Sequence, residues 1–133
     1  MNPQPNPWAR PQTLVEVASD AASMADFHCH VRDFLHEFKF DPRRDRVADE
    51  PPSLRDRFAG GEVADAYLAA VAVEMSLDLG CARPAWTRAA WRALDRPWFA
   101  AKTEGLRLVL LHESPAGFRE RNLFVSENAL SVA

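Results

Sequence analysis

Three potential metal ligands are consecutive in the sequence, at His28, Cys29 and His30. Imidazole and thiolate groups are ligands that zinc prefers. If this segment is helical, however, His28 and His30 point about 200° apart and cannot share one ion. No C-x-x-C or H-E-x-x-H spacing supplies the further ligands that a zinc site needs. We therefore expect neither a metal site nor a cofactor.

A second kind of chemistry could come from the polar face of the same segment. His28 and His36 would share one helical face, and the carboxylates of Asp33 and Glu37 are four residues apart. A small metal-dependent hydrolase or nuclease that uses these four residues is the alternative function. Solvation of a surface explains the carboxylate pair more simply, and the sequence has neither a G-x-S-x-G motif nor a glycine-rich phosphate loop. These observations favour a protein that is not an enzyme.

The segment from Cys81 to Lys102 combines basic and aromatic side chains. It holds five basic residues against one acid, Asp95, and the aromatic residues among them are Trp86, Trp91, Trp98 and Phe99. Arginine and tryptophan are enriched at the energetic centres of protein interfaces. The segment could therefore bind an acidic protein partner.

Three arginines of this segment, Arg88, Arg92 and Arg96, recur every four residues. The first two, and the third if the helix reaches it, would form a basic stripe. A plainer interpretation is that the tryptophans belong to the core and the arginine stems cover apolar surface. In the C-terminal tail, residues 118–124 would bury two Phe and one Leu while two further arginines point elsewhere. The candidate partner-binding residues are therefore Arg88, Arg92, Arg96, Trp98, Arg119 and Arg121, with Trp8 as a second aromatic anchor.

Composition limits the class of protein and of partner. The 133 residues include 22 Ala and 13 Leu but no Ile, which favours helix over sheet. The charges are 16 basic against 19 acidic, a net of -3, which argues against nucleic acid as the main partner. No basic leader followed by an apolar run and no membrane-length apolar stretch occurs, so we expect a cytoplasmic protein. Homo-oligomerisation stays open.

Local signals predict the elements that would position these side chains. Residues 1–11 are rich in Pro and form a flexible arm, and residues 12–133 form one helical domain. A capping box at Thr13 begins either one helix to residue 40 or two helices that meet near residues 19–23. Residues 43–52 are the best linker, Ser53 could cap a short helix, and apolar residues at helical period predict a helix over 62–79. Further short helices are expected over 84–94 and from Thr103 to about Pro115.

The fold class is therefore all-α, as a single-domain bundle of two long antiparallel helices with several short helices. The helix that Thr103 begins would turn Leu106, Val109 and Leu110 inward. Alternation typical of a strand occurs only briefly, near residues 106–110 and 123–125, so we do not expect a sheet.

Four motifs in the second half of the chain carry a resemblance. They are RPAW at 83–86, DRPWF at 95–99, SPAGFRERNLFV at 114–125 and ALS at 129–131. Over residues 62–133 the chain resembles a group of small uncharacterised bacterial proteins encoded beside nucleotidyltransferase-like toxins. The resemblance implies an antitoxin-like protein that masks a toxin, and it carries over no catalytic residue. The function we expect is that of a non-catalytic protein-binding module.

Overall fold

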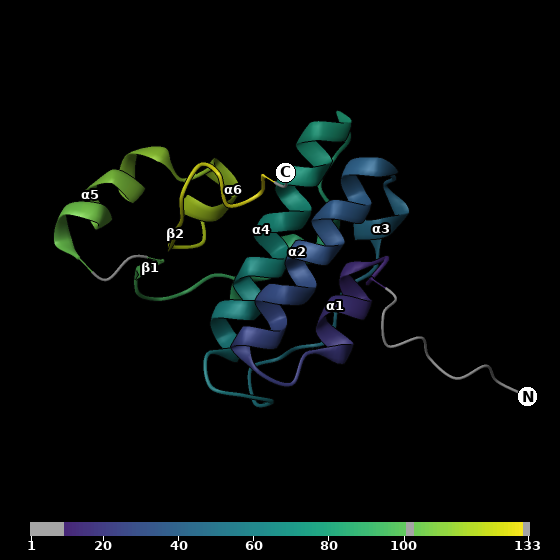
Figure 1. The fold of residues 1–133 in the computed structure, drawn as a ribbon, viewed down its shortest axis with the longest axis horizontal. Helices are drawn as coiled ribbons and strands as arrows, with labels where there is room; N and C mark the ends of the chain where they lie inside the picture. The colour runs from purple at the N-terminus through teal and green to yellow at the C-terminus, as the bar shows by residue number, and fades with distance from the viewer. Residues whose placement is uncertain (1–9, 101–102, 132–133) are drawn as a thin grey trace, which may run out of the picture.

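Helices dominate the computed structural model, which describes residues 10–100 and 103–131 (Figure 1). The elements in chain order are α1 (Leu14–Asp20), α2 (Met24–Phe40), α3 (Asp45–Ala48), α4 (Gly61–Leu79), two 3-10 turns η1 (Ala85–Arg88) and η2 (Ala90–Arg92), β1 (Trp98–Phe99), α5 (Glu104–Glu113), α6 (Ala116–Arg119) and β2 (Leu123–Phe124). The expectation of a mainly helical fold is confirmed. Most of the predicted arm, including Trp8, lies outside the described residues, and so does Lys102. Pro11, the last residue of the predicted arm, is buried.

The first two helices form a hairpin with a cap at each start. Thr13 Oγ1 accepts a hydrogen bond from the Glu16 amide at 3.2 Å, as the capping box predicts. Ser23 Oγ accepts one from the Asp26 amide at 3.1 Å, so the chain forms two helices here and not one. α2 ends at Phe40, directly before Asp41-Pro42, because a proline disfavours helical geometry in the residue that precedes it.

α4 is the central helix, with 14 of its 19 residues buried. It ends as predicted, because Gly80 adopts the left-handed conformation that closes a helix (φ 69°). This helix also carries a fully buried carboxylate residue, Asp65.

The two long helices, α2 and α4, run in the same direction, so the antiparallel arrangement we expected is wrong. Near the start of each helix, the rings of Phe27 and His28 contact the ring of Tyr67, with centroids 5.9 and 5.8 Å apart. Near their ends, Phe38 and Met75 line one cavity. Antiparallel neighbours need only a short loop, whereas parallel ones need a connection that returns along the helix, about 25 Å for 17 residues. Residues 41–60 make that return (Figure 1).

This return segment is packed against the body of the protein, so it is not the free linker we expected over 43–52. It contains α3, whose Val47 is fully buried. The Arg46 side chain is also buried, and its Nη1 donates to Gln12 O at 3.1 Å. Ser53 begins no helix; its hydroxyl donates instead to Asp65 Oδ2 at 2.8 Å.

In the second half of the chain, two expectations about secondary structure are wrong. Residues 84–94 form the two 3-10 turns and not a helix, because Ala89 between them has an extended conformation (ψ 131°). A two-stranded parallel sheet does form, pairing Trp98 with Leu123 and Phe99 with Phe124. Residues 106–110, the other place where strand-like alternation occurs, are helical.

Within the described residues, no helix combines the length and the apolar character that crossing a membrane requires.

Two glycine-to-alanine variants, one test and one control, probe the packing of α4 on the return segment. A Cβ at Gly61 would lie 1.8 Å from the carbonyl oxygen of Leu54, whereas one at Gly105 would meet nothing within 4 Å. We expect Gly61→Ala to lower the free energy of unfolding by about 2 kcal/mol or more, because backbone must move. Gly105→Ala, the matched control in α5, should raise it by about 0.5–1 kcal/mol. Urea unfolding measures both values, and a neutral Gly61→Ala would contradict the packing described.

Candidate functional site

The six candidate partner-binding residues divide into exposed and buried sets. Arg88, Arg96 and Arg119, here called the outer arginines, are exposed. Trp98 is half-buried, and Arg92 and Arg121 are buried. The predicted basic stripe is wrong, because it required Arg88 and Arg92 on one continuous helix, and the chain instead forms two 3-10 turns. The plainer interpretation holds only in part: Trp86 and Trp98 pack against the core, whereas Trp91 is exposed.

Arg92 is 0% exposed and lies between two indole rings. Its guanidinium carbon lies 4.7 Å from the ring centroid of Trp86 and 4.2 Å from that of Trp91, within the range of cation–π attraction. Nη2 donates to Pro51 O at 2.7 Å, and Nη1 donates to Asp65 O at 3.2 Å. Arg92 therefore connects η2 to the return segment and to α4.

Two carboxylates balance the charge of this buried arginine. Burial lowers the pKa of the Arg92 guanidinium, and the charges of Asp65 and Glu50 oppose that shift. Glu50 Oε1 lies 3.6 Å from Arg92 Nη2. The Asp65 carboxylate accepts hydrogen bonds from Ser53 Oγ at 2.8 Å and from the Leu54 amide at 2.7 Å. A buried charge is tolerated when it is paired and hydrogen-bonded in this way.

Arg121 has a similar structural role near the C-terminus. Its Nη2 donates to Thr87 O at 2.6 Å and its Nη1 to Gly117 O at 2.9 Å, which joins α6 to η1. Arg121 and Arg83 both pair with Glu120. Burial opposes ionisation of Glu120, but the hydrogen bonds from these two arginines outweigh it and hold the pKa of Glu120 below its ordinary value. The expectation that Arg121 points away from the core is wrong.

α5 carries the largest run of exposed apolar side chains on one described element. The exposed fractions are 56% for Leu106, 57% for Leu108, 49% for Val109 and 40% for Leu111; we call these four residues the α5 surface. Of the three residues expected to face inward, only Leu110 is buried. The sequence signal that we overlooked is the lack of a continuous polar face between residues 106 and 111.

The last turn of α5 is attached to β2 through Ser114. The Ser114 hydroxyl donates to Leu110 O at 2.6 Å and lies 2.9 Å from Val125 O, and it accepts from the Val125 amide at 2.8 Å. Residue 114 is buried. The exposed apolar helix is therefore held at a defined end and is not a detached segment (Figure 1, left).

The residues of the alternative enzyme do not converge on a shared site. His28 packs against the rings of Phe27 and Tyr67, and Glu37 lies 3.7 Å from Arg10. Across residues 10–100 and 103–131, no group of three or more His, Cys, Asp or Glu side chains could hold a metal ion. Asp33 and His36 gain no additional ligand from another element in that part of the chain.

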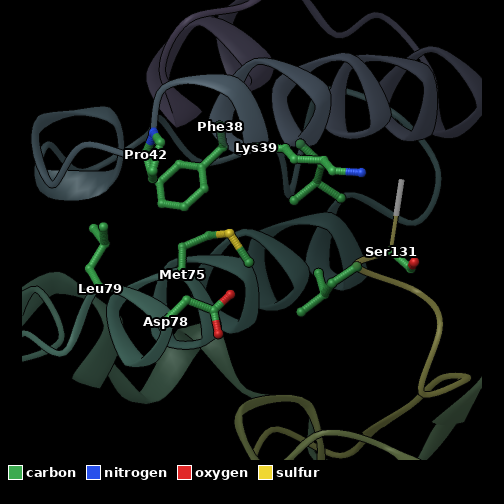
Figure 2. Close-up of a pocket in the computed structure, with 9 residues that line it drawn as sticks. Phe38, Lys39, Pro42, Met75, Asp78, Leu79 and Ser131 are labelled. Carbon is green, nitrogen blue, oxygen red and sulfur yellow. The ribbon is translucent and has the colours of Figure 1, made fainter. Parts of the chain in front are cut away.

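Two cavities border α2 on the side of α4. Figure 2 shows the first, of about 400 Å³, where Phe38 of α2 and Met75 of α4 lie toward each other; we call it the apolar cavity. The second, of about 550 Å³, lies between α2, α4, β1 and residues 128–131. Its polar lining comprises His28, Arg32, Tyr67, Trp98 and Asn128, with Ser131 shared by both cavities. We call this second cavity the polar cleft.

A matched pair of arginine variants tests the structural role of Arg92. Arg92→Ala leaves two carbonyl oxygens and the Asp65 charge without their partner and uncovers two indole rings, so we expect a loss of about 3–5 kcal/mol in the free energy of unfolding. Arg88→Ala, at an exposed position four residues earlier, should change that free energy by less than about 0.5 kcal/mol. Chemical denaturation measures both, and equal losses would show that Arg92 does not hold the core.

The titration of His28 gives a further prediction. Burial lowers the pKa of His28 below 6.5, so the folded state favours the neutral imidazole while the unfolded chain binds a proton more readily. The stability that this difference contributes is present above pH 6.5 and is lost as the pH falls through the folded pKa. His28→Phe keeps a ring between Phe27 and Tyr67 but does not titrate. Between about pH 7.5 and about pH 5, we expect unfolding free energy to fall more in the parent protein than in this variant; equal falls would contradict the shift.

Comparison of the chain with protein-family models, with curated proteins and with solved structures gives no match. The function is therefore argued from the geometry described above.

Proposed function

We propose that this protein is a non-catalytic binding module that masks a partner protein, as an antitoxin-like regulator does. The single observation that carries the proposal is the α5 surface. A helix that is apolar on nearly all sides is normally buried, whereas α5 leaves four large aliphatic side chains in water. Removing such a surface from water is a favourable term in protein association.

The recognition mode that suits this helix is insertion into an apolar groove of the partner. An exposed helix can present side chains three and four residues apart to one groove. Leu108 and Leu111 are three residues apart and therefore share one face of α5. The attachment of Ser114 to β2 holds α5 in place before the partner arrives, which reduces the entropy lost on binding.

The charges near this helix favour an acidic partner. α5 itself contains Arg107 together with Glu104 and Glu113, so the basic charge comes from outside this helix. The outer arginine Arg119 lies on α6, directly after α5 in the chain. Complementary charge at the rim of an interface raises the association rate and selects among partners. A nucleic acid fits less well, because the chain has a net charge of -3 and aliphatic side chains gain nothing from a phosphate backbone.

Charge reversal at α5 tests the proposal. The protein is co-expressed with the product of the adjacent gene, and capture through an affinity tag is measured together with growth. We expect Leu108→Glu with Leu111→Glu to reduce capture at least tenfold, because two carboxylates cannot enter an apolar groove. The control is Leu77→Glu, which places the same charge on an exposed leucine of α4. Unchanged capture by the double variant would overturn α5 as the binding surface.

The outer arginines are tested in the same assay. Replacing Arg88, Arg96 and Arg119 together by Gln should slow association and remove most of its dependence on salt, because exposed charges act through a screened field. Arg92 is left unchanged because it is buried.

A second copy of the chain is the competing occupant of the α5 surface. If light scattering shows a dimer that the double leucine variant dissociates and that excludes the partner, homo-oligomerisation replaces masking as the function of α5.

A further inference from the structure

We propose that the polar cleft binds a small organic carboxylate with an apolar body. At about 550 Å³, the cleft has the size of a pocket for such a molecule. Its walls come from four separate parts of the chain, α2, α4, β1 and residues 128–131, so folding creates it. The proposal concerns a different face from the α5 surface and does not depend on partner binding.

Among the described residues that line the cleft, Arg32 alone carries a formal charge. No Asp or Glu is among the described residues that line it, and Arg32 is exposed with no ion pair or hydrogen bond from its side chain to any described residue. His28, one turn earlier on α2, is held neutral because burial lowers its pKa. A single guanidinium beside neutral groups matches a ligand with one negative charge, and its planar fork suits a carboxylate.

Tyr67 supplies a hydroxyl that lacks a partner among the described residues; its ring is buried, but the hydroxyl oxygen is not fully enclosed. The residue is only 7% exposed, and burial raises the pKa of its phenol to about 12, so the hydroxyl keeps its proton at neutral pH. Three edge-to-face contacts hold the ring, with Phe27, His28 and Phe118. A carboxylate oxygen in the cleft would accept a hydrogen bond from this hydroxyl.

The remaining lining residues suit an apolar body. Val31, Leu35 and Ala129 contribute aliphatic wall, and Trp98 contributes an indole. Leu35 and Ser131 line both cavities, so the apolar cavity lies directly beside the polar cleft. Besides Phe38 and Met75, the charged side chains of Lys39 and Asp78 line that neighbouring cavity. An organic cation fits poorly, because no carboxylate lines the cleft in the described part of the chain. A free phosphate, which carries up to two charges and no apolar body, also fits less well.

The test uses paired probes that differ only in charge. Cinnamate and octanoate are titrated into the full chain and compared with cinnamamide and octanamide, and binding is followed by protein NMR. We expect each carboxylate that binds to do so about tenfold more tightly than its amide, because a hydrogen bond to a charged group is stronger than one between neutral groups. Shifts should concentrate on residues that line the cleft.

Variants separate the two anchoring groups. Arg32→Gln should remove the advantage of the carboxylate over the amide, and Tyr67→Phe, which keeps all three ring contacts, should weaken carboxylate binding about fivefold. Arg44→Gln removes a different exposed arginine, near α3, and should leave the affinity unchanged. The double variant at Leu108 and Leu111 should bind the probes as the parent does, so failure of partner capture and failure of this proposal are distinguishable.

Three results would overturn the proposal. They are the absence of saturable binding at millimolar carboxylate, equal affinity for carboxylate and amide, and an Arg32→Gln variant that binds carboxylate as tightly as the parent.

Discussion

The fold depends on one buried guanidinium, that of Arg92, and on the buried carboxylate that balances it. Because α2 and α4 run in the same direction, the chain must return along their length, and Arg92 holds that return segment against α4 through Pro51 O. Asp65 completes the attachment by accepting from the Leu54 amide. Both cavities border the parallel pair of helices that this return segment connects.

Local chemistry explains which features could be predicted from the sequence. Thr13, Gly80 and the pair Asp41-Pro42 mark helix ends through interactions within a few residues of themselves. The apolar period over 62–79 likewise depends on neighbours three and four positions away. Of the candidate partner-binding residues, those that are exposed, such as Arg88 and Arg119, stay as predictions for a binding surface.

The features that could not be predicted depend on contacts between distant residues. Spacing alone cannot distinguish a basic stripe in water from an arginine between two indole rings, because the partners of Arg92 lie 27 and 41 residues away. The direction of α4 relative to α2 depends on the same contacts. In the polar cleft, His28 and Arg32 share a helical face because they are four residues apart, but Tyr67 and Asn128 reach them only through the tertiary fold.

The hydroxyl of Ser114 makes α5 and the wall of the polar cleft one mechanical unit. It bonds both to the last turn of α5 and to Val125, directly after β2. β2 pairs with β1, and β1 carries Trp98 into the cleft. A displacement of α5 would therefore be passed to the cleft through the Ser114 hydroxyl and the two paired strands, with Trp98 as the lining residue at the end of that connection.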